Sequence, residues 1–201
     1  MIDFPKSSAE ISELADELVN DLRGKIKDTH SAMRWTCQNI SSLEDFFRRR
    51  GAACFFSGSP DGPEFLWDFA GYVKNRGILI TSESEHSTKY EDITYDFDKL
   101  LYGRSPLKLM ICRIDTKCNT KEKAQEEAEK IRLYIEKCIH DNCIYYSRGE
   151  VFVIYCVWYA DEEGENQDIA YIFQVDGEPD YVSITPEQHF QPIAGCPKSG
   201  F

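Results

Sequence analysis

Residues 107–114, LKLMICRI, form a near-continuous apolar run that limits the folds open to this chain. A run with apolar residues on both alternating faces is typical of a strand buried on two sides, as in a parallel sheet covered by helices. The segment before it has a helical pattern, with an apolar side formed by Ile93, Phe97, Leu100 and Leu101. Together with an earlier strand-like run, these segments predict a right-handed parallel crossover.

Two amphipathic helices are predicted ahead of the sheet. The first, over residues 7–26, repeats apolar residues at helical spacing behind a serine N-cap. The second covers residues 29–50 and ends in three consecutive arginines before Gly51, a typical helix stop. These arginines, residues 48–50, are expected either to cap their helix or to contact phosphates.

Short strands and one more helix complete the predicted fold. Five further segments have strand-like patterns: 52–56, 64–73, 78–85, 150–159 and 168–175. The first two are expected to pair as an antiparallel hairpin, and the last two as a hairpin that extends the sheet. A charged helix is predicted over residues 121–139. The expected fold class is therefore α/β, with a mixed central sheet flanked by helices.

A single domain is expected from the length of 201 residues, which is enough to bury a core without disulfides. We divide it into an N-terminal helical segment (1–52), an α/β core (53–176) and an irregular tail (177–201). The eight cysteines include no CxxC pair, so reduced thiols are expected. No apolar run reaches the roughly 20 residues needed to cross a bilayer, and no signal peptide is predicted. These features favour a soluble, cytoplasmic protein without membrane contact.

The net charge of −12 bears on the ligands that this chain can bind. Binding to nucleic acid rests on lysines and arginines that displace counterions from phosphates, so the charge opposes a broad nucleic-acid surface. A nucleic-acid ligand would need local basic patches, a divalent metal ion or a basic partner.

Carboxylates are expected to gather where two neighbouring strands lie side by side. Asp68 falls in one predicted strand, and Glu83 and Glu85 end the next. Side chains two apart on a strand share a face, so both glutamates can converge with Asp68. Such a cluster is unfavourable without a cation, and Mg²⁺ is a hard ion that prefers oxygen ligands. The alternative is that these are solvated acids in a chain that holds 35.

Three further residues are candidates for this site. Lys99 lies on the following helix, where it can reach the strand end or form an ordinary ion pair with Asp96. Glu64, four positions before Asp68, is a candidate additional ligand by its place on the strand. His86 directly follows the glutamates and is a candidate contact to substrate.

The segments PEFLWDFAGY, ILITSESEHS and ITYDFDKLLYGRSPLKLMICRI resemble the PD-(D/E)xK nuclease-like (restriction-endonuclease-like) superfamily over residues 63–114. The resemblance implies that Asp68 and Glu83 bind Mg²⁺ or Mn²⁺. It normally places a lysine two positions after the second acid, where this chain has Glu85. Other members supply the lysine from the following helix, which Lys99 fits. Glu85 would then be a base or an extra metal ligand.

Two functions from different classes follow. The resemblance implies a metal-dependent nuclease that hydrolyses phosphodiester bonds of DNA or RNA, and a homodimer is considered because cutting both strands needs two sites. The alternative is a catalytically inactive protein of the same fold that binds a basic partner through its acidic surface. An acidic mimic of nucleic acid is a third option.

Overall fold

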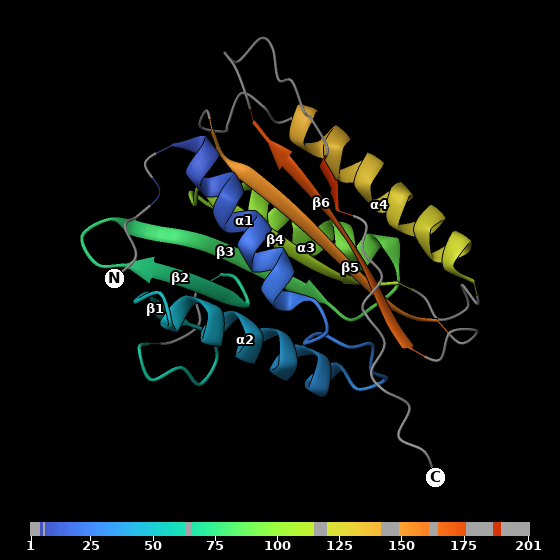
Figure 1. Ribbon diagram of the computed structural model, residues 1–201, viewed down its shortest axis with the longest axis horizontal. Helices are drawn as coiled ribbons and strands as arrows, with labels where there is room; N and C mark the ends of the chain where they lie inside the picture. Colours follow the sequence, from blue (N-terminus) through green and yellow to red (C-terminus); the bar gives the residue numbers. More distant parts are fainter. Residues whose placement is uncertain are drawn as a thin grey trace.

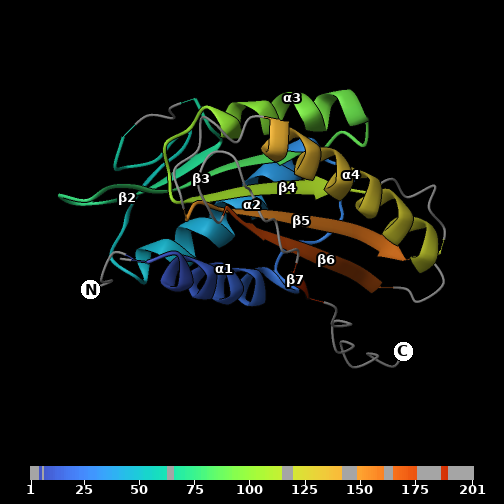
Figure 2. The same ribbon diagram turned by 90° about the horizontal axis from the view of Figure 1, so that it is seen from above.

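The computed structural model shows a mixed sheet with helices packed on both of its faces (Figures 1 and 2). The residues that it describes are 5, 7–62, 66–114, 120–141, 149–160, 165–175 and 187–189. The predicted α/β class, with a mixed central sheet flanked by helices, is confirmed. Within this described part of the chain, no helix combines the length and the apolarity needed to cross a membrane.

The described residues form four helices: α1 (Ser8–Leu22), α2 (Ala32–Arg48), α3 (Tyr90–Leu101) and α4 (Lys121–Asp141). The first two begin behind a serine that caps them, whereas α3 begins behind Lys89 without a side-chain cap. The Ser7 hydroxyl accepts a hydrogen bond from the backbone N–H of Glu10, and Ser31 does the same for Arg34. Each serine thereby satisfies one of the N–H groups that a helix start leaves without a partner.

The described residues form seven strands, which follow one another across the sheet in the order of the chain. They are β1 (Ala53–Phe55), β2 (Phe69–Val73), β3 (Gly77–Glu85), β4 (Leu107–Arg113), β5 (Val151–Ala160), β6 (Glu165–Gln174) and β7 (Glu187–His189). Strands β3, β4 and β5 run parallel to one another, because α3 and α4 each return the chain to the end of the sheet where the preceding strand began. The other neighbouring strands are antiparallel. The predicted parallel crossover and both hairpins are confirmed.

Two predictions about strands were wrong. The sequence predicts an irregular tail that includes residues 187–189, but these residues pair with β6, whose outer edge offers unpaired backbone groups. The strand expected from residue 64 begins at Phe69, so Asp68 lies just before β2. The Asp68 side chain explains why β2 begins only at Phe69. Its carboxylate accepts a hydrogen bond from the backbone N–H of Ser84 on β3, which in a longer strand would pair with a backbone carbonyl of the neighbouring strand.

The sheet has helices on both of its faces (Figure 2), and an apolar core lies on each side of it. Helices α1 and α2 cover one face, and α3 and α4 cover the other. Strand β4 contributes to both, because Leu109 and Ile111 point to α1 and α2, while Met110 and Cys112 point to α3 and α4. This alternation confirms that the LKLMICRI run is a strand buried on two sides.

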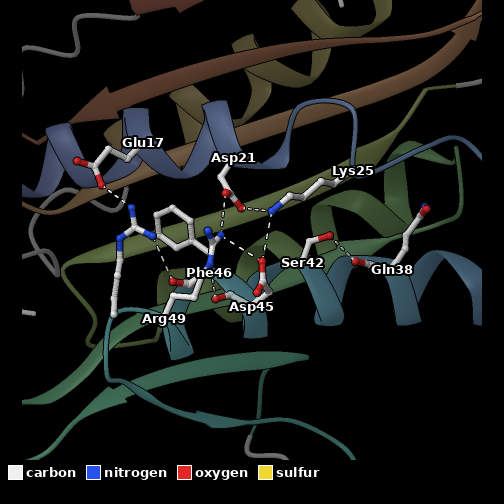
Figure 3. Close-up of polar contacts among 9 residues, drawn as sticks. Glu17, Asp21, Lys25, Gln38, Ser42, Asp45, Phe46 and Arg49 are labelled. Carbon is white, nitrogen blue, oxygen red and sulfur yellow. Dashed lines mark hydrogen bonds and ion pairs between the residues drawn. The ribbon is translucent and has the colours of Figure 1, made fainter. Parts of the chain in front are cut away.

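Charged side chains join α1 to α2 on the outer surface (Figure 3). Arg49 donates to Asp21 at 2.9 Å, and Arg50 donates to Glu17 at 2.7 Å. Arg48 pairs with two further carboxylates. All three arginines of the predicted helix stop therefore pair with carboxylates of this chain.

Candidate functional site

Glu83 is a buried carboxylate on β3, in the row that faces α3 and α4. It pairs in register with Met110 of β4, and its exposed fraction is 0%. Helix α3 brings Lys99 to it, and the Lys99 ammonium donates a hydrogen bond to Glu83 Oε2 at 2.8 Å. The structure therefore brings together two of the four predicted site residues.

Lys99 contacts two carboxylates. Besides Glu83, its ammonium lies 2.9 Å from Asp96 Oδ1, so both alternatives considered for this lysine occur at once. Burial acts to lower the pKa of Lys99, but the two carboxylates outweigh it and raise the pKa above its ordinary value. The turn that carries Lys99 is held by Trp67, whose indole N–H donates to the Lys99 carbonyl at 3.1 Å.

Asp68 is held beside Glu83 by Ser84. Its Oδ2 accepts hydrogen bonds from the backbone N–H of Ser84 at 2.9 Å and from the Ser84 hydroxyl at 3.0 Å. Asp68 is close enough to Glu83 for its charge to raise the pKa of Glu83. The predicted neighbourhood of these two acids is therefore present, although Asp68 reaches it from the turn before β2.

Glu85 joins the same group through Asp96. Its Oε1 accepts a hydrogen bond from the backbone N–H of Ser87 at 2.6 Å. Burial and a hydrogen bond with the Asp96 carboxyl raise the pKa of Glu85 to about 7. Because Asp96 also contacts Lys99, Glu85 is linked through Asp96 to Lys99 and Glu83, while Asp68 acts on Glu83 through its charge.

The environment of Glu83 disfavours its charged form. Burial raises the pKa of Glu83 to about 8; Lys99 acts against this shift, and the charge of Asp68 adds to it. Glu83 Oε1 is also buried, and within the described part of the chain it has no hydrogen-bond partner. A buried acceptor without a partner costs stability, so this oxygen is suited to receive a proton or a cation.

The fit of these residues to a metal ion is partial. Carboxylate oxygens are the donors that Mg²⁺ prefers, and Asp68 and Glu83 would supply them, although Asp68 is bonded to the Ser84 hydroxyl, which lies in the other row of β3 from Glu83. The described residues contain no group of three or more His, Cys, Asp or Glu side chains that could hold a metal ion as they stand. Glu85 is turned to Ser87 and Asp96, so it would have to turn from them to become a third ligand.

Two other candidates stand apart from this group. Nε2 of His86 lies 2.7 Å from the Thr29 carbonyl oxygen, and its ring packs edge-on against Trp35 at 6.1 Å between centroids. These contacts give His86 a role in joining the end of β3 to the start of α2. Glu64, the candidate additional ligand, lies outside the described residues.

Asp96 is the residue whose role the sequence reasoning missed. Its position three residues before Lys99 on the helix predicts only an ion pair between the two. The spacing was a sufficient signal for that pair. The contact with Glu85 depends on how α3 sits over β3, which helical spacing alone does not specify.

Comparisons with protein-family models, with curated proteins and with solved structures find no match to this chain. The chemistry that the site can perform is therefore inferred from its own side chains. A buried carboxylate lies beside a charged lysine and an aspartate, and a fourth carboxyl is linked to the lysine through Asp96.

Proposed function

We propose that this chain is a metal-dependent hydrolase of phosphodiester bonds in nucleic acid. Asp68 and Glu83 would hold Mg²⁺ or Mn²⁺, and Lys99 would lie beside the phosphate. The observation that carries the proposal is the 2.8 Å contact between Lys99 and Glu83. It supports the view that a lysine from α3 takes the role that the PD-(D/E)xK pattern normally gives to the position of Glu85.

Lys99 would stabilise negative charge on the phosphate. Its ammonium stays charged because two carboxylates raise its pKa, and its side chain is only 25% exposed. A fixed positive charge in such a partly dry place stabilises charge that develops in a transition state more than it would in water. When bound, the metal ion would supply Lewis-acid chemistry and lower the pKa of a water molecule.

Glu85 is suited to move a proton. Its pKa of about 7 means that comparable amounts of the charged and neutral forms exist near neutral pH. A group with such a pKa can both accept a proton and release it at that pH. Glu85 would therefore act as a base rather than as a permanent metal ligand, which agrees with its contacts to Ser87 and Asp96.

The test is cleavage of nucleic acid by the purified chain. We expect cleavage of DNA or RNA with Mg²⁺ or Mn²⁺, and its loss in Glu83→Gln and in Lys99→Met. Asp98→Asn is the matched control, because it removes an exposed carboxylate from the same helix and should keep full activity. The proposal fails if the wild-type chain cleaves no single- or double-stranded substrate, or if Glu83→Gln cleaves at the wild-type rate.

A second function is favoured by a specific observation. The positive charge of Lys99 already neutralises the Glu83 carboxylate. The described part of the chain also holds no group of three His, Cys, Asp or Glu side chains that could bind a metal ion as they stand. Together with the net charge of −12, this supports a catalytically inactive protein of the same fold that binds a basic partner. Calorimetry with Mn²⁺ separates the two: a binding site that disappears in Glu83→Gln favours the hydrolase, and no binding favours the inactive protein.

A further inference from the structure

Two tyrosines turn their rings to solvent on the helix that carries Lys99. Tyr95 is 71% exposed and Tyr102, at the C-cap of α3, is 81% exposed. Tyr95, Lys99 and Tyr102 follow one another at i, i+4 and i+7, so they share one side of the helix. An aromatic ring exposed to this extent leaves most of its apolar faces in water, where another planar group can cover them.

The Tyr95 ring lies next to the proposed reaction centre. The Lys99 ammonium that contacts Glu83 also lies 5.9 Å from the centroid of the Tyr95 ring. The rise of an α-helix, about 1.5 Å per residue, places Tyr102 roughly 10 Å further along the axis. A ligand that covers both rings would therefore pass Lys99 on its way from one to the other.

We propose that Tyr95 and Tyr102 form a base-stacking surface that binds single-stranded nucleic acid along α3. The inference rests on the proposed function, since it names the substrate class of the same site. A base on the Tyr95 ring would bring its phosphate near Lys99, and the next bases would lead toward Tyr102. Arg104, exposed two positions after Tyr102, would meet the backbone beyond it.

The charge of the protein favours stacking over phosphate contacts as the source of affinity. A chain with net charge −12 cannot rely on counterion release, and α3 itself carries exposed acids at Glu91 and Asp98. Stacking on an aromatic side chain needs no positive charge and accepts any base, because every base has a flat π-face.

Stacking on these rings also favours unpaired strands over duplexes. In a duplex, the faces of the bases are covered by their neighbours, and only base edges and the backbone remain accessible. Unpaired bases can be turned outward and laid on aromatic rings. The described surface near Lys99 offers two such rings, whereas a duplex would meet mainly the acidic charges of α3.

The inference is tested by fluorescence anisotropy with labelled twelve-nucleotide strands of thymidine and of uridine, at low salt with EDTA to prevent cleavage. We expect the wild-type chain to bind unpaired strands more tightly than a duplex of the same length. Tyr95→Ala and Tyr102→Ala should each raise Kd about tenfold, the typical loss for one stacked base. Both positions are exposed, so alanine should leave the fold intact.

Two controls separate stacking from other causes. Tyr95→Phe and Tyr102→Phe keep the ring without its hydroxyl, so their Kd should stay within about twofold of the wild-type value. Met33→Ala removes a side chain that is 77% exposed on α2, across the sheet from α3, and should not change Kd. Comparing Kd for the thymidine strand with Kd for the uridine strand shows whether the surface prefers DNA or RNA.

Several results would overturn the inference: no binding of unpaired strands, equal affinity for duplex, or wild-type affinity in the Tyr95→Ala/Tyr102→Ala double variant. A basic protein that binds this face in place of unpaired strands would also overturn it. The proposed function fails separately. Tyrosine-dependent binding without cleavage in Mn²⁺ refutes the hydrolase alone, and cleavage with an unchanged KM in the double variant refutes the stacking surface alone.

Discussion

Glu83 shows how one side chain can bring several constraints into conflict. It is fully buried, it faces Lys99 with one oxygen, and its other oxygen is buried without a hydrogen-bond partner among the described residues. Burial disfavours the charge that the lysine favours. Removing this carboxyl alone would take one carboxylate away from Lys99, whereas keeping it leaves a buried oxygen without a hydrogen-bond partner among the described residues.

The pKa of Glu83 predicts how stability depends on pH. In the unfolded chain this carboxyl loses its proton near pH 4.5, and in the folded chain near pH 8. Between these values the folded state binds more protons, so the free energy of unfolding should fall as the pH rises. Without divalent metal, we expect the free energy of unfolding to fall by on the order of a few kcal/mol between pH 5 and pH 8. Urea denaturation at a series of pH values measures this change.

Glu83→Gln should make this curve flatter, because glutamine does not titrate. Glu91→Gln is the matched control, since it removes an exposed carboxylate from α3, and its curve should run parallel to that of the wild-type chain. Equal pH dependence in Glu83→Gln and in the wild-type chain would show that Glu83 is not the group responsible. Glu85 also lowers the free energy of unfolding as the pH rises to about 7, both in the wild-type chain and in Glu83→Gln.

At the scale of residues, sequence could predict which side chains meet but not how they bond. The helix position of Lys99 was enough to suggest its contact with Glu83, whereas Glu85 is linked to Lys99 only through Asp96, a link that spacing does not indicate. The hydrogen bonds from Ser84 to Asp68 depend on where β2 begins, which is a matter of register rather than of spacing.

Among the elements, the junction between α3 and β4 depends on a glycine. A Cβ atom added at Gly103 would lie 2.8 Å from Cζ2 of Trp67, well inside contact distance. Gly103→Ala should therefore displace Trp67 and weaken its hydrogen bond to the Lys99 carbonyl. We expect a loss of about 1–3 kcal/mol in the free energy of unfolding, with a change in tryptophan fluorescence. Arg104→Ala, an exposed change one residue later, should alter neither.

Strands β4 and β5 are joined at their start by a buried ion pair. The Lys108 ammonium contacts the Glu150 carboxylate and lies 4.8 Å from the centroid of the Phe152 ring. The Lys108 side chain is fully buried, and burial lowers its pKa while Glu150 acts to raise it. Removing one member of such a pair leaves the other charge without its counter-ion in a dry place.

Lys108→Met should thus lower the free energy of unfolding by about 3–5 kcal/mol, measured by urea denaturation. The double variant Lys108→Met/Glu150→Gln should recover part of the loss, because no charge is then left behind. If the double variant is less stable than Lys108→Met, the lost packing of the lysine stem is the larger effect, and the predicted role of charge is wrong.

Elements with a strong apolar pattern were predictable, and weakly patterned ones were not. The LKLMICRI run predicted β4 because six of its eight residues are apolar and they occupy both alternating faces, which leaves neither face polar. Strand β7 has only three residues, Glu187–His189, and none is apolar. Its pairing depends on the free edge of β6, which the sequence of the segment itself does not reveal.

The whole molecule is organised by one sheet with a core on each side. Phe47 on α2 and Phe97 on α3 are fully buried in different cores. Because the same strands line both cores, we expect one cooperative unfolding transition, with circular dichroism and fluorescence giving the same midpoint. Phe47→Ala and Phe97→Ala should each cost about 3–5 kcal/mol, and separate transitions in either variant would contradict the prediction.

The order of the strands has a consequence for how this protein can be made. Each described strand pairs only with its neighbours in chain order, so no strand pairing spans more than one intervening helix; α1, by contrast, packs on β5 and β6 and has to wait for them. Pairings between distant segments slow folding and leave apolar surfaces exposed on the ribosome. Here the sheet can grow from β1 onward, with each emerging strand adding to an edge that is already in place.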